Sequence, residues 1–283
     1  MTSAVIFGLL AALLYGLADI TGRSTNRING VPTTLFWSQL VLVVAASIAL
    51  LFFKLPKAGL AEWALLVIAG MVLTGATAFL YTGLAKGRLS VVAPLMASYG
   101  AVSSLLALLT GEHLSAGIGT GLVMTVAGAI LCAIRSDDRT SKSSGWIYGA
   151  GASLCYGVSY WLQGKYLLPA FGPVPTLWAC YVVAVLAIGA YSLMWKRPIN
   201  EVKGLKGAGL IGLSASLGGG GLAALNLAQA DGDIAIATAL SSASTLVTVV
   251  FAVIALKEKP GVWGWAGITA VIAGIALLNL SSQ

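Results

Sequence analysis

Charged residues are scarce in this chain of 283 residues, of which 16 are lysine or arginine and nine are aspartate or glutamate. They make up 9% of the sequence, whereas a soluble domain carries about a quarter. Hydrophobic residues make up 58%, and the mean hydropathy is +0.94. Because too few polar residues remain to cover so large an apolar core, the composition excludes a soluble globular protein and predicts a membrane-embedded one.

Histidine and cysteine are also rare, which limits the chemistry available. The one histidine, His113, lies beside Glu112, so a zinc site or a histidine-based catalytic pair lacks members. The three cysteines, Cys132, Cys155 and Cys180, lie within apolar stretches, where a thiol is a small core side chain. Neither an ATP-binding G-x-x-x-x-G-K-[ST] motif nor a G-x-S-x-G beside a usable base occurs. We therefore expect no metal, no cofactor and no enzyme; an intramembrane enzyme is a remote alternative.

Ten long stretches contain no acidic or basic residue, and each is close to the roughly 20 residues that cross a bilayer as a helix. Such continuous apolar runs exclude a β-barrel, whose strands would alternate apolar and polar residues. The sequence therefore predicts an all-α polytopic membrane protein with ten transmembrane helices. The stretches are residues 1–18, 28–53, 63–85, 89–111, 113–134, 143–164, 166–195, 207–230, 234–256 and 260–283.

Basic residues concentrate in alternate loops. The loops after the first, third, fifth, seventh and ninth stretches hold thirteen, and the others hold three, Lys54, Lys57 and Lys165. The positive-inside rule then places both termini outside, with the protein in the cytoplasmic membrane. The net charge of +7 is explained by these loops, so we expect no nucleic-acid partner. Met1–Ala18 lacks a basic start and a cleavage site, which indicates a retained first span.

An internal repeat divides the chain into residues 1–134, a polar linker at 135–144, and residues 145–283. The segment Gly8 to Gly16 matches Gly149 to Gly157, and further matches follow in the same order with offsets of 141 to 146 residues. Each half holds five predicted spans. Because five is odd, the second half inserts upside down relative to the first, which is the inverted-repeat architecture of many secondary transporters. We expect a central cavity between the halves.

The chain resembles the drug/metabolite transporter superfamily, in particular its EamA-type members, over its whole length. The resemblance rests on the two repeats, on Gly111-Glu112 after the fourth span, on the pairs Tyr15-Gly16 and Tyr156-Gly157, and on Pro94. It departs at residues 257–259, where Lys-Glu-Lys stands, and in lacking a proline at the counterpart of Pro94. The resemblance implies a small-solute carrier with a cavity lined by spans one to four and six to nine. It also implies peripheral spans five and ten, and relatives that export amino acids and other metabolites.

Polar stripes in the first and sixth spans predict cavity-lining residues. Tyr15 and Asp19 lie four residues apart, as do Tyr156 and Tyr160, with Gln163 following, so each set shares a helix face. A polar stripe is unfavourable against lipid and should face the protein interior. Tyrosine belts at the membrane surface are the alternative. Asp19 is the one acid within a predicted span, and either handles substrate or protons or pairs with Arg23 at the span boundary.

Other spans supply candidates whose hydroxyls and amides serve either cavity lining or helix packing. They are Thr77, Tyr81, Ser98, Tyr99, Asn226, Ser241 and Thr245. Pro94 and the run Gly218, Gly219, Gly220 and Gly221 are candidate hinges, because proline and glycine weaken a helix. Very close approach of another helix is the alternative reading of the four glycines.

Tryptophans near the span ends read as interface anchors, although Trp37 and Trp178, from similar places in the two repeats, are also candidates to cap the cavity. The spacing Gly117-x-x-x-Gly121 in span five permits a close helix contact. We therefore expect a monomer or weak homodimer surrounded by membrane lipid.

The expected function is secondary transport, with export of an amino acid or similar zwitterion by alternating access. A carrier for organic cations, drugs or nucleobase-like solutes that uses Asp19 is the alternative, and proton coupling stays open. A channel is disfavoured, because rings of buried charge are absent from the sequence pattern.

Overall fold

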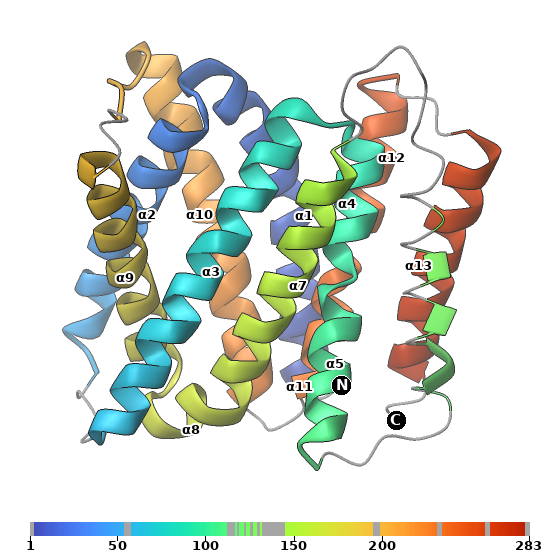
Figure 1. Ribbon diagram of the computed structural model, residues 1–283, viewed down its shortest axis with the longest axis horizontal. Coiled ribbons are helices and arrows are strands. Elements are labelled where there is room, and N and C mark those ends of the chain that lie inside the picture. Colours follow the sequence, from blue (N-terminus) through green and yellow to red (C-terminus); the bar gives the residue numbers. More distant parts are fainter. Residues whose placement is uncertain are drawn as a thin grey trace.

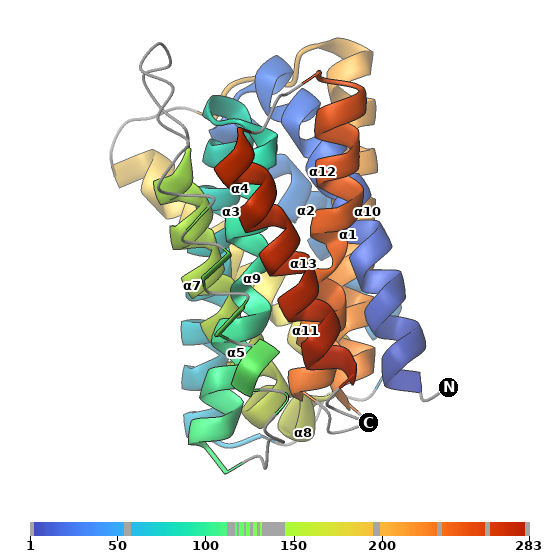
Figure 2. The ribbon, with the colours of Figure 1, turned by 90° about the vertical axis from the view of Figure 1, so that its right-hand side faces the viewer.

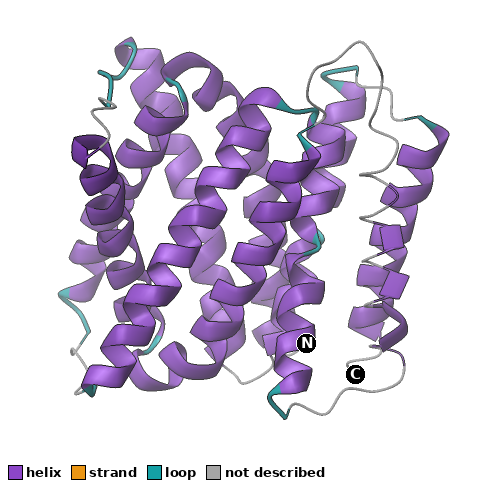
Figure 3. Cartoon of the chain, viewed as in Figure 1, coloured by secondary structure: helices purple, strands orange, loops and turns teal. Residues whose placement is uncertain are grey.

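The computed structural model describes residues 3–53, 58–111, 145–194, 199–230, 234–257 and 261–280, together with parts of 117–131. Secondary structure in these residues is helical throughout (Figure 3). The elements are α1 (Ser3–Asn29), α2 (Val31–Leu50), α3 (Leu60–Lys86), α4 (Leu89–Ala97), α5 (Tyr99–Leu109), α7 (Trp146–Leu162), η1 (Gln163–Leu167), α8 (Leu168–Phe171), α9 (Pro173–Met194), α10 (Gly204–Ala230), α11 (Ile234–Ser242), α12 (Ser244–Ile254) and α13 (Val262–Leu280).

The helices form an upright bundle (Figure 1). Six described helical segments are long and apolar enough to cross a bilayer, counting α4 and α5 as one. Large apolar side chains such as Leu51, Leu60 and Leu193 are more than 80% exposed, which is expected of a surface that faces lipid. Trp146 and Trp263 lie half-exposed at helix starts, as interface anchors do. The chain is therefore a polytopic all-α membrane protein.

The two repeats are inverted relative to each other. In Figure 1, α1 starts at the end of the bundle where both chain termini lie, whereas α7 starts at the opposite end. The turn between α1 and α2 is made by Gly30, with a φ of 82°, and the corresponding turn before α9 by Gly172, with a φ of 76°. In both places a threonine amide four residues on, Thr34 or Thr176, closes the turn by bonding the glycine carbonyl. Positive φ at both glycines explains why the repeat keeps them.

Equivalent helix crossings hold the two repeats together. A Cβ atom at Gly16 would lie 3.0 Å from the carbonyl oxygen of Ser244, and one at Gly157 would lie 3.0 Å from that of Tyr99. Thus α1 packs closely on α12 in the same way that α7 packs on α5. The first helix of each repeat therefore contacts the fourth span of the other repeat, which interlocks the halves.

Spans four and nine are both broken near their middle. α4 gives way to α5 at Ser98, and α11 gives way to α12 at Ala243. Pro94 lies inside α4, but span nine breaks at the matching place without a proline. There Ser241 donates its hydroxyl to the carbonyl of Thr238, a back-bond that bends helices. The lack of a second proline is thus compensated by hydroxyl side chains.

The tenth span is peripheral, as the resemblance implied. Figure 2 shows α13 on the outside of the bundle, and Ile268 and Val271 pack it on Leu95 of α4 and Val249 of α12. A Cβ at Gly128, in the partly described fifth span, would lie 2.6 Å from the amide nitrogen of Val271, so this segment contacts α13. The spacing from residue 117 to 121 falls on a partly described segment, and the dimer prediction stays a prediction.

One predicted helix boundary is wrong. The first span does not end at residue 18, since α1 continues to Asn29 and places Asp19 well inside the helix. Asp19 is 3% exposed and lies against other helices, so its carboxylate does not face lipid. The four glycines lie within α10, which is a continuous α-helix from Gly204 to Ala230, and their role as a hinge stays a prediction.

Candidate binding cavity

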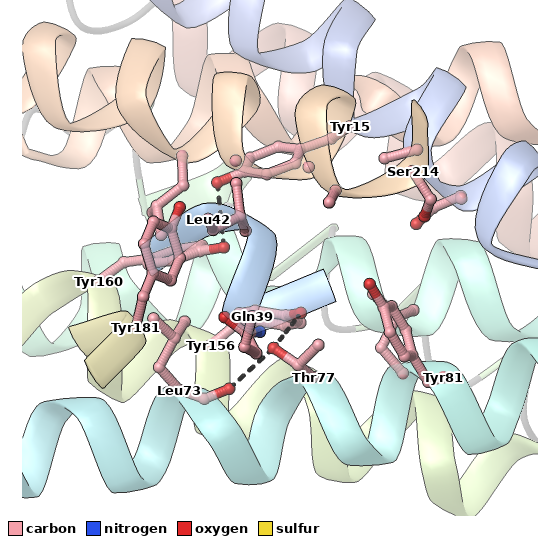
Figure 4. Close-up of a pocket in the computed structure, with 17 residues that line it drawn as sticks. Tyr15, Gln39, Leu42, Leu73, Thr77, Tyr81, Tyr156, Tyr160, Tyr181 and Ser214 are labelled. Carbon is pink, nitrogen blue, oxygen red and sulfur yellow. Dashed lines mark hydrogen bonds between the residues drawn. The ribbon is translucent and has the colours of Figure 1, made fainter. Parts of the chain in front are cut away.

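A cavity of about 80 Å³ lies in the interior of the bundle between the two repeats. Its lining residues come from α1, α2 and α3 of the first repeat and from α7, α9 and α10 of the second (Figure 4). One water molecule needs roughly 10–15 Å³ measured in this way, so the cavity is large enough for several waters or a small solute. Spans four and nine, which the resemblance included, contribute nothing to the lining of this cavity.

Five tyrosines dominate the lining, namely Tyr15, Tyr81, Tyr156, Tyr160 and Tyr181. Figure 4 shows Tyr15 and Tyr160 pointing toward each other, and their hydroxyl oxygens lie 3.1 Å apart. The Tyr156 hydroxyl donates to Thr77 Oγ1 at 3.2 Å. Because these bonds join α1 to α7 and α7 to α3, the polar stripes predicted on spans one and six meet across the cavity.

A sixth tyrosine, Tyr99 at the start of α5, supports the others from behind. Its ring centroid lies 5.2 Å from that of Tyr160, edge to face, and 6.1 Å from that of Tyr156. Its hydroxyl lies 2.8 Å from Ser241 Oγ, which joins the two broken spans. We call Tyr15, Tyr99, Tyr156 and Tyr160 the tyrosine cluster. Tyr99 and Ser241 were predicted to line the cavity, but they lie behind its wall.

Asp19 is the only carboxylate among the lining residues, and none of them is a lysine, arginine or histidine. Its Oδ2 accepts a hydrogen bond of 3.2 Å from Thr248 Oγ1 on α12. The same hydroxyl lies 3.2 Å from the carbonyl oxygen of Ser244, so its single proton is shared between two acceptors. The carboxylate therefore keeps acceptor capacity that it can offer to a group in the cavity.

Two buried polar atoms in the lining have no hydrogen-bond partner. They are Oε1 of Gln39, which is 6% exposed, and the hydroxyl of Tyr181, which is 5% exposed. Buried polar atoms are almost always bonded, so such atoms in a cavity indicate a place where a ligand or water bonds. Neither residue was predicted from the sequence. The sequence could have indicated Gln39, because it is a lone amide well inside an apolar stretch. Nothing in the sequence around Tyr181 distinguishes it from other tyrosines in membrane spans.

The four glycines of α10 allow close packing against α1 and α2. A Cβ at Gly221 would lie 2.7 Å from the ring of Tyr15, and one at Gly220 would lie 3.4 Å from Leu14. Gly218 and Gly219 also line the cavity. The glycines thus provide space for neighbouring side chains, which is the alternative reading of the sequence pattern.

The remaining predicted site residues lie elsewhere. Trp37 is 36% exposed, and Trp178 donates its indole N–H to Ser47 Oγ at 2.9 Å, so neither caps the cavity. Ser98 and Thr245 donate to the backbone carbonyls of Pro94 and Ala93. These two hydroxyls serve helix packing in the broken spans.

Gln163 and Asn226, the last two predicted residues, bond to each other instead of lining the cavity. The Asn226 side-chain amide donates to Gln163 Oε1 at 3.2 Å. Both side chains are fully buried. They lie beyond the tyrosine cluster along α7, η1 and α10.

Comparison with known proteins agrees with this architecture. A solved structure described only as "Crystal structure of protein" matches with a TM-score of 0.71 and 18% sequence identity, covering 98% of this chain and 96% of the other. At that identity the match shows the fold alone. No curated protein matches the sequence. Residues 2–134 and 143–280 each match the EamA-like transporter family. Since these matches cover nearly the whole chain, the protein belongs to the EamA-like transporter family.

Proposed function

We propose that this protein exports a small metabolite carrying an ammonium group, with amino acids as the first candidates, across the cytoplasmic membrane. The observation that supports this most directly is the cavity between inverted repeats, with one carboxylate and no basic side chain among its lining residues. Inverted repeats that enclose a polar site near the midplane are typical of carriers that work by alternating access.

The lining chemistry favours a positively charged group. Asp19 and the free Oε1 of Gln39 both accept hydrogen bonds, as an ammonium group requires. The tyrosine rings add cation–π attraction, worth about 0.5–2 kcal/mol each where water is excluded. The carboxylate of a zwitterion would bond to hydroxyl donors, for which Tyr181 is available.

The position of the cavity agrees with the proposed export. On α1 the lining runs from Tyr15 to Asp19, toward the end where α1 meets α2. That end also carries Arg27, Lys86 and Lys203, and the positive-inside rule assigns it to the cytoplasm. On the opposite side the tyrosine cluster lies between the cavity and the other face. In an exporter this side of the cluster is where a solute would load from the cytoplasm before its release outside.

A second candidate substrate class is organic cations without a carboxylate. It is favoured by the same absence of lysine, arginine and histidine among the lining residues. If Asp19 binds a proton when the cation leaves, it would couple transport to protons.

Flux into proteoliposomes tests the proposal. Alanine, leucine and phenylalanine are each compared with the matching amine, which lacks the carboxylate, and with the N-acetyl derivative, which lacks the ammonium group. We expect flux of at least one amino acid or amine and none of its N-acetyl derivative. Equal flux of acetylated and free forms would contradict the ammonium proposal, and no flux of any of these solutes would contradict the transport assignment for this substrate class.

A further inference from the structure

Three buried amides, which we call the amide group, lie on the far side of the tyrosine cluster. Gln163 donates to Ser159 Oγ at 3.1 Å and accepts from Asn226, while the Gln229 amide donates to the carbonyl oxygen of Tyr160 at 3.4 Å. Gln163, Asn226 and Gln229 are at most 2% exposed. Two acceptors in this amide group, Asn226 Oδ1 and Gln229 Oε1, have no hydrogen-bond partner. Leaving such atoms unbonded is unfavourable by about 1–3 kcal/mol each, so their presence points to a ligand.

The amide group lies further along α7 and α10 than the residues that line the cavity. The last cavity-lining residue of α10 is Leu222, and Gln229 follows seven residues later, roughly 10 Å along a helix. On α7 the last is Tyr160, and Gln163 follows at the start of η1. A solute that passed the tyrosine cluster would therefore meet these amides next.

A second cavity, of about 400 Å³, lies at this end and is lined by Gln229 and Lys165 among others. Lys165 Nζ donates to the carbonyl oxygen of Thr110 at 3.1 Å, which leaves two of its three N–H groups for other acceptors. Lys165 belongs to η1, a five-residue π-helix from Gln163 to Leu167. π-Helical turns are rare in proteins, but many of those that occur lie at functional sites. The extra residue in such a turn reorients the side chains that follow it.

We propose that this second cavity is an additional binding site for zwitterionic amino acids, used on the side of the tyrosine cluster away from Asp19. The ammonium group bonds to Gln229 Oε1, with Asn226 Oδ1 behind it, and the carboxylate bonds to Lys165. The two cavities then differ in chemistry. The first offers a carboxylate and tyrosines, whereas the second offers a cation beside amide oxygens and so prefers a zwitterion to a simple amine. This inference rests on the proposed transport function.

The first experiment measures KM from each face, with leucine and its amine, 3-methylbutylamine, as probes. Proteoliposomes hold the protein in one orientation, which a cleavable C-terminal tag reports. We expect Lys165→Met to raise the KM for leucine about tenfold from the face that carries Lys165, and to leave the opposite face and the amine within about twofold. Gln229→Leu should raise KM for both probes from that face, and Gln229→Glu should restore it.

The matched control is Lys206→Met, which makes the same substitution at an exposed lysine near the start of α10, outside both cavities, and should leave every KM unchanged. Equal effects of Lys165→Met on leucine and the amine, or equal effects from both faces, would overturn the inference while leaving transport itself intact. Absence of flux in the unaltered protein would instead count against the proposed function.

A second experiment needs no transported probe. In a variant without native cysteines, Gln229→Cys is treated with a membrane-impermeant cationic thiol reagent from either face, and Ala228→Cys, whose position is fully buried in the core, is the control. We expect Gln229→Cys to react from the Lys165 face at least about ten times faster than Ala228→Cys, and leucine to slow the reaction. Equal rates at the two positions would overturn the site.

Discussion

The glycine run in α10 allows a sharp test of whether it provides space or flexibility. In Gly221→Ala the new Cβ would lie 2.7 Å and 2.8 Å from Cδ1 and Cε1 of Tyr15. The ring cannot move freely, because its hydroxyl bonds to Tyr160 across the repeat boundary. In Gly220→Ala the nearest atom is 3.4 Å away, on Leu14, and in Gly218→Ala it is 3.9 Å away, on Ala18. Those two positions accept a methyl group at ordinary contact distance.

The magnitudes follow from these distances. Replacing a helical glycine by alanine stabilises the helix by about 0.8–1 kcal/mol. At Gly221 the overlap costs about 1–3 kcal/mol, and loss of the Tyr15–Tyr160 bond costs about 0.5–1.5 kcal/mol more. We therefore expect Gly221→Ala to lower the free energy of unfolding by about 2 kcal/mol, and Gly218→Ala and Gly220→Ala to raise it by about 1 kcal/mol.

The assay is thermal unfolding of the purified variants in one detergent, followed by flux in proteoliposomes. A chain of this size shifts its Tm by about 2–4 °C per kcal/mol, so Gly221→Ala should unfold about 4–8 °C below the unaltered protein. Stabilisation of Gly221→Ala equal to that of Gly220→Ala would refute the packing argument. Equal loss of flux in all three alanine variants, without destabilisation, would instead favour the hinge.

Three further predictions address the site and the repeat interface. Asp19→Asn should reduce uptake of the amine probes about tenfold and remove the decline in flux on acidification from pH 8 to 5, because only the carboxylate can be neutralised by a proton. A variant that keeps both the flux of the unaltered protein and its decline on acidification would exclude Asp19 from the mechanism. Tyr160→Phe should lower the free energy of unfolding by about 1 kcal/mol, and adding Tyr15→Phe should cause no further loss, because both changes remove the same hydrogen bond. Strictly additive losses in thermal unfolding would contradict the bond between the two tyrosines. Gly16→Ala and Gly157→Ala should each lower the free energy of unfolding by about 1–3 kcal/mol. The new Cβ would lie 2.6 Å from a valine Cβ at Gly16 and 2.5 Å from one at Gly157. An unchanged Tm for either variant would contradict the close helix crossings.

Much of the architecture was predictable because membrane insertion depends on composition summed along each segment. Scarce charge and long apolar runs indicated a helical membrane protein, and the repeat with an odd number of spans implied inversion. The stripe of Tyr15 and Asp19 was predictable for a similar reason, since helical periodicity places both residues on one face and lipid excludes polar faces. These properties depend on local sequence and need no knowledge of neighbouring helices.

The position of each polar side chain relative to the cavity, and the helix that it contacts, depended on the packed structure. Periodicity assigns a residue to a face but does not say which helix crosses that face, so it put Gln163 and Asn226 in the same cavity as Tyr156. In the structure Tyr156 lines the cavity, whereas Gln163 and Asn226 bond to each other beyond the tyrosine cluster and do not line it.

The sequence by itself therefore determined that this protein lies in the membrane as two inverted halves, because the hydrophobic effect acts on each segment separately. Only the tertiary structure decided that Gln39 and Tyr181 join Asp19, that the glycines of α10 make room for Tyr15, and that Lys165 shares a cavity with Gln229. Those outcomes depend on which side chains meet where helices cross, and such meetings arise from packing between segments distant in the chain.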